Sequence, residues 1–220
     1  SGVSTDRTRV SMSALKPNLD ASLDLFADVL RNPTFAPAEI ERLRTVQLSR
    51  IRQELTEPSA IAQREIGPLV YGPNHPYGVP LTGSGTADAV GAITRDEIVA
   101  YAARWLRPDN ATLFVVGDTT LAELKPQLER ALGGWRAPAA PKGVKAFTPA
   151  PTPAAGRIVL IDRPSSPQSV ILGGLPLPLK GTDDPLTLNA ANEVLGGSFT
   201  SRLNTDLRET KGWSYGVRSY

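Results

Sequence analysis

The stretch that decides the fold covers residues 94–132 and reads TRDEIVAYAARWLRPDNATLFVVGDTTLAELKPQLERAL. Thr94, with Glu97 three residues later, matches a capping box, which predicts that a helix begins there. The near-continuous apolar run 111–116 ends at a glycine and predicts a buried strand. Residues 120–132 return to a helical pattern. Helix, strand and helix in succession indicate the α+β class, with mixed sheets flanked by helices.

The residues before this stretch extend the same mixture. Alternation of apolar and polar residues predicts a half-buried strand over 7–15. Apolar residues at helical spacing predict a helix that Asn18 caps, and a longer helix from Pro37 to Leu55. A third helix begins at Pro58, because proline is favoured in the first turn.

The residues after the stretch divide the chain. Residues 135–156 are rich in proline and alanine and have no apolar period, which predicts a linker. We therefore expect parts of two tandem, homologous domains, with 1–134 the C-terminal part of the first and 157–220 the N-terminal part of the second. The elements expected beyond the linker are strands over 157–162, 168–175 and 213–220, and helices over 185–195 and 199–210.

Composition excludes several kinds of protein. Hydrophobic residues make up 40% and charged residues 21% of the 220 positions, which is ordinary globular usage. The net charge of +2 is spread without a basic stripe, so no nucleic-acid partner is expected. No apolar run is long enough for a membrane span. The absence of cysteine excludes disulfides and thiolate sites, and fits either the bacterial periplasm or the cytoplasm.

The residues alone indicate little chemistry. His75 is the only histidine, so a zinc site with two or three imidazoles cannot be built. His75 also lies in a turn rich in glycine and proline, which favours a packing role over a catalytic triad. The sequence contains no P-loop and no dinucleotide-binding fingerprint.

Several short segments, taken in order, resemble the insulinase/pitrilysin metallopeptidases, a family that includes mitochondrial processing peptidase. The segments that carry the resemblance are Asn32–Phe35, Ile40–Arg42, Tyr71–Gly78, Arg107–Asp118, Leu195–Gly197, Ser201–Leu203, Leu207–Glu209 and Ser214–Val217. Together they cover nearly the whole chain.

The resemblance implies an active site in two halves. One half is an inverted His-x-x-Glu-His zinc motif with a third ligand, a glutamate, on a later helix. In this chain the third-ligand position is occupied by Arg50, and the position of a supporting carboxylate by Leu43. Arginine has no lone pair for a metal. Glu54, one turn further on, remains open as a displaced ligand.

The other half implied by the resemblance is an arginine–tyrosine pair, which Arg208 and Tyr215 match in type and spacing. Both residues can donate hydrogen bonds to a peptide carbonyl as it gains negative charge, so we expect them to be catalytic and substrate-binding. Phe199, beside the glycine pair Gly196-Gly197, is expected to join them in binding substrate.

Three functions remain open on these observations. The first is a substrate-binding subunit without zinc, inactive alone, which completes the active site of a homologous zinc-bearing peptidase subunit. The second is a self-sufficient zinc peptidase whose His-x-x-Glu-His motif lies upstream, and the third is a scaffold with no activity. If the chain is the substrate-binding subunit, it binds a peptide substrate and the zinc belongs to its partner. Independently of the function, the frequent use of alanine, arginine and proline suggests a bacterial source.

Overall fold

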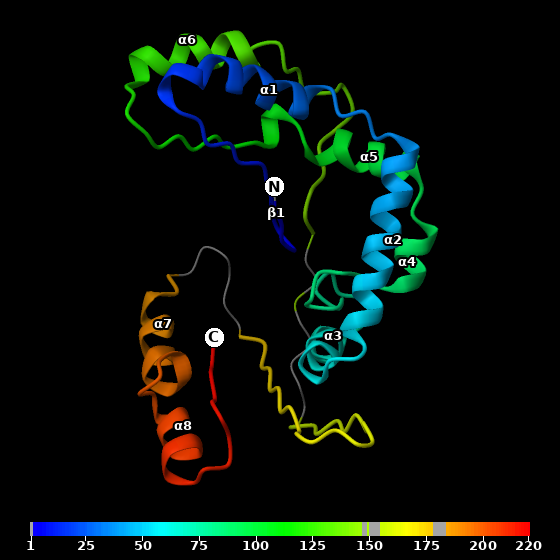
Figure 1. Cartoon of the computed structure of the whole chain (residues 1–220), viewed down its shortest axis with the longest axis vertical. Coiled ribbons are helices and arrows are strands. Elements are labelled where there is room, and N and C mark those ends of the chain that lie inside the picture. The colour runs from blue at the N-terminus through cyan, green and yellow to red at the C-terminus, as the bar shows by residue number, and fades with distance from the viewer. Residues whose placement is uncertain (1, 147–148, 150–154, 178–183) are drawn as a thin grey trace. The chain divides into compact units, whose positions relative to one another are not determined.

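The computed structural model describes residues 2–146, 149, 155–177 and 184–220 (Figure 1). The chain divides into two compact units, Ser1–Pro176 and Leu177–Tyr220, and each is described by itself.

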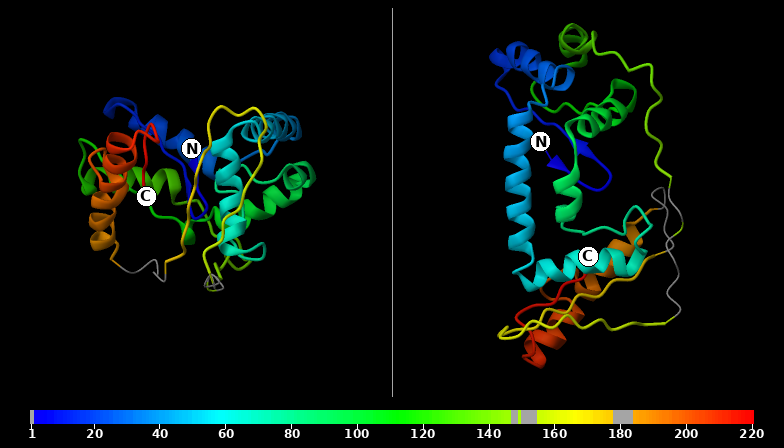
Figure 2. Two further views of the ribbon diagram at one scale, coloured as in Figure 1. Left: turned by 90° about the horizontal axis from the view of Figure 1, so that it is seen from below. Right: turned by 90° about the vertical axis from the view of Figure 1, so that its right-hand side faces the viewer.

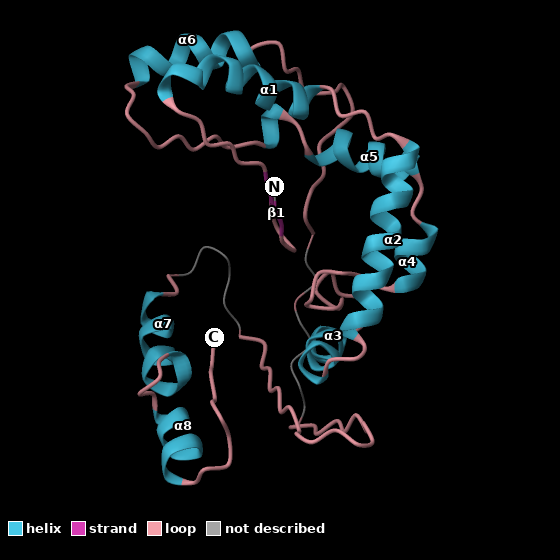
Figure 3. Ribbon diagram, in the orientation of Figure 1, coloured by secondary structure: helices cyan, strands magenta, loops and turns pink. Residues whose placement is uncertain are grey.

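The first unit is built from helices joined by extended segments, as Figure 3 shows. Two short 3₁₀ turns, η1 (Lys16–Asn18) and η2 (Pro108–Asn110), accompany the helices. The helices are α1 (Leu19–Arg31), α2 (Pro37–Glu54), α3 (Pro58–Tyr71), α4 (Ala87–Ala92), α5 (Arg95–Trp105) and α6 (Leu121–Leu132). The capping box that predicted α5 is confirmed, since Thr94 accepts from the Glu97 backbone and Glu97 accepts from the Thr94 backbone. A second capping box, of Thr120 with Glu123, begins α6.

A small apolar core holds α1 against α6, which lie side by side in Figure 1. Its buried members are Leu23 and Ala27 of α1 and Ala131 of α6. An ion pair between Arg130 and Asp20, with 2.7 Å between nitrogen and oxygen, links the same two helices at the surface. The helical spacing of the apolar residues in α1 places them on one face, which is why this helix needs a partner.

Arg44 attaches α2 to α4, which runs beside it in both views of Figure 2. Its guanidinium donates to the carbonyls of Ile93 at 2.7 Å and Gly91 at 3.1 Å, and to that of Val90. These carbonyls end α4 and start the turn into α5. The guanidinium therefore satisfies acceptors that the end of a helix leaves unpaired.

The first part of the expected linker packs on the first unit. Arg107, which is buried, donates to the carbonyls of Ala140 at 2.7 Å and Pro138 at 3.2 Å. Lys142 donates to the carbonyl of Asp109 at 3.1 Å. Residues 147–148 and 150–154 of the expected linker 135–156 lie outside the described residues.

The expected strands differ most from the structure. The only sheet among the described residues pairs β1 (Gly2–Val3) with β2 (Thr8–Arg9) in antiparallel register, so the strand expected over 7–15 is reduced to two residues. The mixed sheets are not present in the described part of the chain. The segments 111–116, 157–162, 168–175 and 213–220 contain no strand.

The prediction of a buried strand over 111–116 is wrong. Phe114 is 85% exposed and Val116 is 99% exposed. Strand formation requires hydrogen bonds from a neighbouring strand, and no neighbour pairs with these residues within the described ranges. An apolar run therefore stays extended and keeps its side chains in solvent.

The second unit consists of two successive helical segments followed by an extended segment. Its elements are α7 (Leu186–Asn192), the π-helical turn η3 (Glu193–Gly197), α8 (Arg202–Asn204) and the π-helical turn η4 (Thr205–Thr210). Gly212, with φ of +63°, reverses the chain after η4 in a conformation that favours glycine. The following segment returns to η3, where the backbone N–H of Ser219 donates to the carbonyl of Gly196 at 3.0 Å.

Across the residues that the structure describes, no helix combines the length and the apolar character needed to cross a membrane.

Candidate functional site

Helix α2 carries the position that the sequence resemblance assigns to a third zinc ligand. Arg50 stands there, and its side chain is mostly exposed. Its Nε donates to Glu54 Oε1 at 3.1 Å, and a terminal nitrogen donates to the carbonyl of Thr82 at 3.4 Å. Leu43, seven residues earlier, is 55% exposed. The two positions thus present a cation and an apolar group.

Glu54 lies at the centre of a buried polar network. It is 9% exposed, and Arg64 of α3 is 8% exposed. Arg64 donates to Glu54 Oε2 at 2.8 Å, and the Ser84 hydroxyl donates to the same oxygen at 2.5 Å. Arg64 also donates to the Ser84 hydroxyl oxygen at 2.7 Å and to the carbonyl of Gly85 at 2.8 Å. The network joins α2, α3 and the loop after α3.

The network also fixes the ionisation of Glu54. Burial by itself would raise the pKa of this carboxyl group. Hydrogen bonds from Ser84, Arg64, Thr82 and Arg50 outweigh burial, so the pKa of Glu54 lies below its ordinary value. Glu54 is therefore an ionised carboxylate whose charge is matched inside the protein.

These residues do not fit a zinc ion. Both oxygens of Glu54 already accept hydrogen bonds from Arg50, Arg64 or Ser84, and two guanidinium groups would repel a divalent cation at this place. Over the ranges that the structure describes, no three His, Asp or Glu side chains gather as metal ligands. The geometry thus disfavours Glu54 as a displaced ligand.

Acid should weaken the Glu54 network. A carboxyl group with a lowered folded-state pKa stabilises the fold above its unfolded pKa, and this stabilisation is lost as pH falls through the folded-state value. We expect the difference in unfolding free energy between the wild-type chain and Glu54→Gln to be constant near pH 7 and to shrink below about pH 4.5. Urea denaturation from pH 7 to pH 3 measures it. A difference that does not change with pH would contradict the lowered pKa.

His75 is engaged in packing its own loop. Its ring stacks on Tyr71 with 5.0 Å between centroids, and its Nδ1 accepts from the backbone N–H of Tyr77 at 3.0 Å. These contacts agree with the packing role that the sequence favours.

Arg208 and Tyr215 come together in the second unit. The Cζ of Arg208 is 5.3 Å from the centroid of the Tyr215 ring and 4.5 Å from that of Phe199. Tyr215 is 92% exposed and Phe199 is 63% exposed. All three residues predicted to bind substrate therefore share one surface of the second unit, with Arg208 as their common contact.

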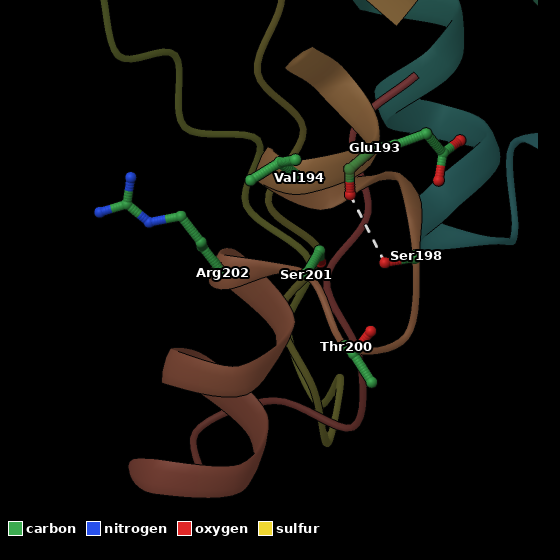
Figure 4. A pocket seen from close by; sticks show the side chains of 6 residues that line it. All are labelled: Glu193, Val194, Ser198, Thr200, Ser201 and Arg202. Atoms are coloured by element: carbon green, nitrogen blue, oxygen red, sulfur yellow. Dashed lines mark hydrogen bonds between the residues drawn. The ribbon is translucent and has the colours of Figure 1, made fainter. Parts of the chain in front are cut away.

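A cavity of about 330 Å³ also lies in this unit (Figure 4). Its lining residues come from η3, from the turn after it and from the start of α8. They are Glu193, Val194, Ser198, Thr200, Ser201 and Arg202. Arg208 and Tyr215 are not among them, and Figure 4 shows the Arg202 guanidinium extending away from the other labelled side chains. The cavity is thus separate from the arginine–tyrosine pair.

Sequence patterns did not identify three residues of these sites. Arg64 lies 10 residues and Ser84 lies 30 residues from Glu54 in the sequence, and both bond to its carboxylate. Asn204, which is 3% exposed, bonds to residues on both sides of Arg208. A charged residue on a helix and an asparagine before a turn look like surface residues until their burial is known.

Family models match both parts of the chain. The model described as "Insulinase (Peptidase family M16)" matches residues 1–71, and the model described as "Peptidase M16 inactive domain" matches residues 92–220. The chain belongs to peptidase family M16. This confirms the resemblance to the insulinase family.

Bacterial relatives carry the names of zinc proteases. An uncharacterized zinc protease of Mycobacterium tuberculosis is 30% identical over 211 residues, which cover 93% of this chain and 46% of the relative. An uncharacterized zinc protease of Bacillus subtilis is 27% identical over 206 residues, which cover 94% of this chain and 48% of that relative. The M16 chain described here therefore spans about half the length of these relatives.

Solved structures show the same fold. A protease from Helicobacter pylori aligns with a TM-score of 0.72 at 20% identity, over 93% of this chain and 49% of that one. A peptidase M16 inactive domain from Pseudomonas fluorescens aligns with a TM-score of 0.72 at 22% identity, over 91% of this chain and 47% of that one.

Proposed function

We propose that this M16 chain is part of the substrate-binding subunit of a metalloendopeptidase, and that it completes the active site of a homologous zinc-bearing subunit. In this proposal the partner holds the zinc, and this chain alone is inactive. The two-domain arrangement belongs to the proposal, with residues 1–134 in the first domain, 157–220 in the second, and the linker between.

The contact between Arg208 and Tyr215 carries the proposal. A carbonyl oxygen gains negative charge when its peptide bond is attacked, and fixed hydrogen-bond donors near that oxygen stabilise the charge. Arg208 supplies a permanent cation and Tyr215 a hydroxyl donor. The Arg208 Cζ lies 5.3 Å from the centroid of the Tyr215 ring, and this proximity supports a joint role. A scaffold without activity has no need of this pair.

The metal half of the site supports the same division of roles. Arg50 stands at the third-ligand position and Glu54 is bonded to Arg64 and Ser84. When zinc is bound by a peptidase, it polarises the carbonyl and activates water. In this proposal the partner subunit supplies that chemistry, and this chain binds and orients the peptide.

Mixing the full-length protein with a zinc-bearing M16 homologue from the same organism tests the proposal. We expect cleavage of an unfolded peptide by the mixture and by neither protein alone. Metal analysis after dialysis should find zinc in stoichiometric amount in the homologue only, which serves as the positive control. Cleavage by the full-length chain alone with its own zinc would support the self-sufficient peptidase instead. A mixture that forms a complex but cleaves nothing would support the scaffold.

A further inference from the structure

The guanidinium of Arg208 contacts two aromatic rings and one acidic side chain. Its Cζ lies 4.5 Å from the Phe199 ring centroid and 5.3 Å from that of Tyr215. Both distances are within the range of cation–π attraction, which is about 6 Å. Its Nε pairs with Glu209 Oε1 at 3.3 Å. Three neighbours therefore restrict the side chain before any peptide binds.

These contacts leave the donor edge of Arg208 available. An aromatic ring attracts the flat face of a guanidinium and uses none of its N–H groups, whereas a carboxylate would use them. Glu209 Oε1 lies 3.3 Å from Nε. Within the described residues, the terminal nitrogens of Arg208 donate no hydrogen bond to the protein, so two N–H₂ groups can face a substrate carbonyl.

Asn204 ties together the segments that carry the two rings. Its Nδ2 donates to the carbonyl of Phe199 at 2.6 Å, and its Oδ1 accepts from the backbone N–H of Val217 at 3.1 Å. Phe199 precedes α8, and Val217 follows Tyr215 by two residues. A side chain that is 3% exposed thus holds the backbone on both sides of Arg208.

We propose that Phe199 and Asn204 position Arg208 for the substrate, with Phe199 holding the plane of the guanidinium and Asn204 fixing the segments that carry Phe199 and Tyr215. The inference rests on the proposed function of Arg208. It gives Phe199 a different role from the direct peptide contact expected from the sequence. An arginine fixed in advance loses less conformational freedom when it binds, which favours preorganised donors.

Two substitutions of Phe199 test whether its aromatic ring, rather than the bulk of its side chain, holds Arg208. We expect Phe199→Leu in the full-length chain, mixed with the zinc-bearing homologue, to lower kcat/KM about three- to tenfold, the range of an exposed to partly desolvated cation–π contact. Phe199→Tyr keeps the ring, and its added hydroxyl reaches solvent because the side chain is largely exposed. This control should stay within about twofold of wild type. Asn204→Asp, which removes the donor to Phe199, should resemble Phe199→Leu.

The same substitution in an Arg208→Ala background distinguishes positioning from direct contact. If Phe199 acts through Arg208, Phe199→Leu should cause no further loss once the guanidinium is absent. A loss of the same size in both backgrounds would mean that Phe199 touches the peptide itself and would overturn the inference. If Arg208→Ala alone leaves cleavage unchanged, the proposed function fails instead.

A second measurement needs no partner. Aromatic rings displace the NMR resonance of the Arg208 Nε–H group in the full-length chain. We expect the resonance to move toward its ordinary position in Phe199→Leu and to stay displaced in Phe199→Tyr. An unchanged resonance in a folded Phe199→Leu protein would show that the ring does not hold the guanidinium.

Discussion

Replacement of Tyr215 with phenylalanine should lower turnover by the mixed peptidase about 10²- to 10³-fold, the usual cost of losing one donor to a developing oxyanion. The change in KM should be smaller, because the hydroxyl acts mainly in the transition state. Phenylalanine keeps the aromatic ring that lies 5.3 Å from the Arg208 guanidinium. Steady-state kinetics of peptide cleavage with the full-length variant and its zinc-bearing partner measure the effect.

Tyr220 provides a matched control for this substitution. Its side chain is 96% exposed, like the 92% exposed Tyr215, and it lies in the same extended segment. No ring contact joins it to Arg208 among the described residues. Tyr220→Phe should therefore leave turnover unchanged within about twofold. If Tyr215→Phe also changes turnover less than twofold, Tyr215 is not a catalytic residue and the pair with Arg208 only packs.

The helices could be predicted because their signals are local. Thr94 and Glu97 form the expected capping box, and Pro37 begins α2. The apolar residues of α1 recur at helical spacing, and Leu23 and Ala27 are buried against α6. Each of these signals lies within a few residues, so no knowledge of distant segments is needed.

The strands could not be predicted from their own residues, because a strand depends on its neighbours. Residues 111–116 have the composition of a buried strand, yet Phe114 and Val116 are exposed. An apolar run indicates which residues are suited to a sheet. Whether the strand forms depends on a partner that contributes hydrogen bonds, and none of the described residues pairs with this run.

The two halves of the candidate site differ in the same way. Arg208 and Tyr215 lie only seven residues apart, and the resemblance singled them out as a pair. Gly212 permits their contact by reversing the chain after η4. The network around Glu54 depends on Arg64 and on Ser84, which lie on other segments. A glutamate on a helix gives no sign in the sequence of which arginine it meets.

Arg64→Ala should be among the most destabilising substitutions in the first unit. It removes the guanidinium and leaves the ionised Glu54 buried with Arg50, Ser84 and Thr82 beside it. Breaking a buried ion pair by removing one partner costs roughly 3–5 kcal/mol of unfolding free energy. We expect a loss of about 3 kcal/mol, because the three remaining donors compensate part of the charge. Equilibrium denaturation in urea at pH 7 measures it.

Two further variants test whether the loss of stability comes from the unpaired buried carboxylate rather than from the loss of any ion pair. Arg42 pairs with Glu39 at 2.9 Å on the surface of α2, with both side chains more than half exposed, so Arg42→Ala should cost less than about 1 kcal/mol. The double variant Glu54→Leu/Arg64→Met removes both charges and fills a similar volume, so it should recover most of the stability lost in Arg64→Ala. If the double variant is as unstable as the single one, the cost does not come from an unpaired buried carboxylate. The network would then act through its bonds to Ser84 and Gly85, which hold the loop after α3.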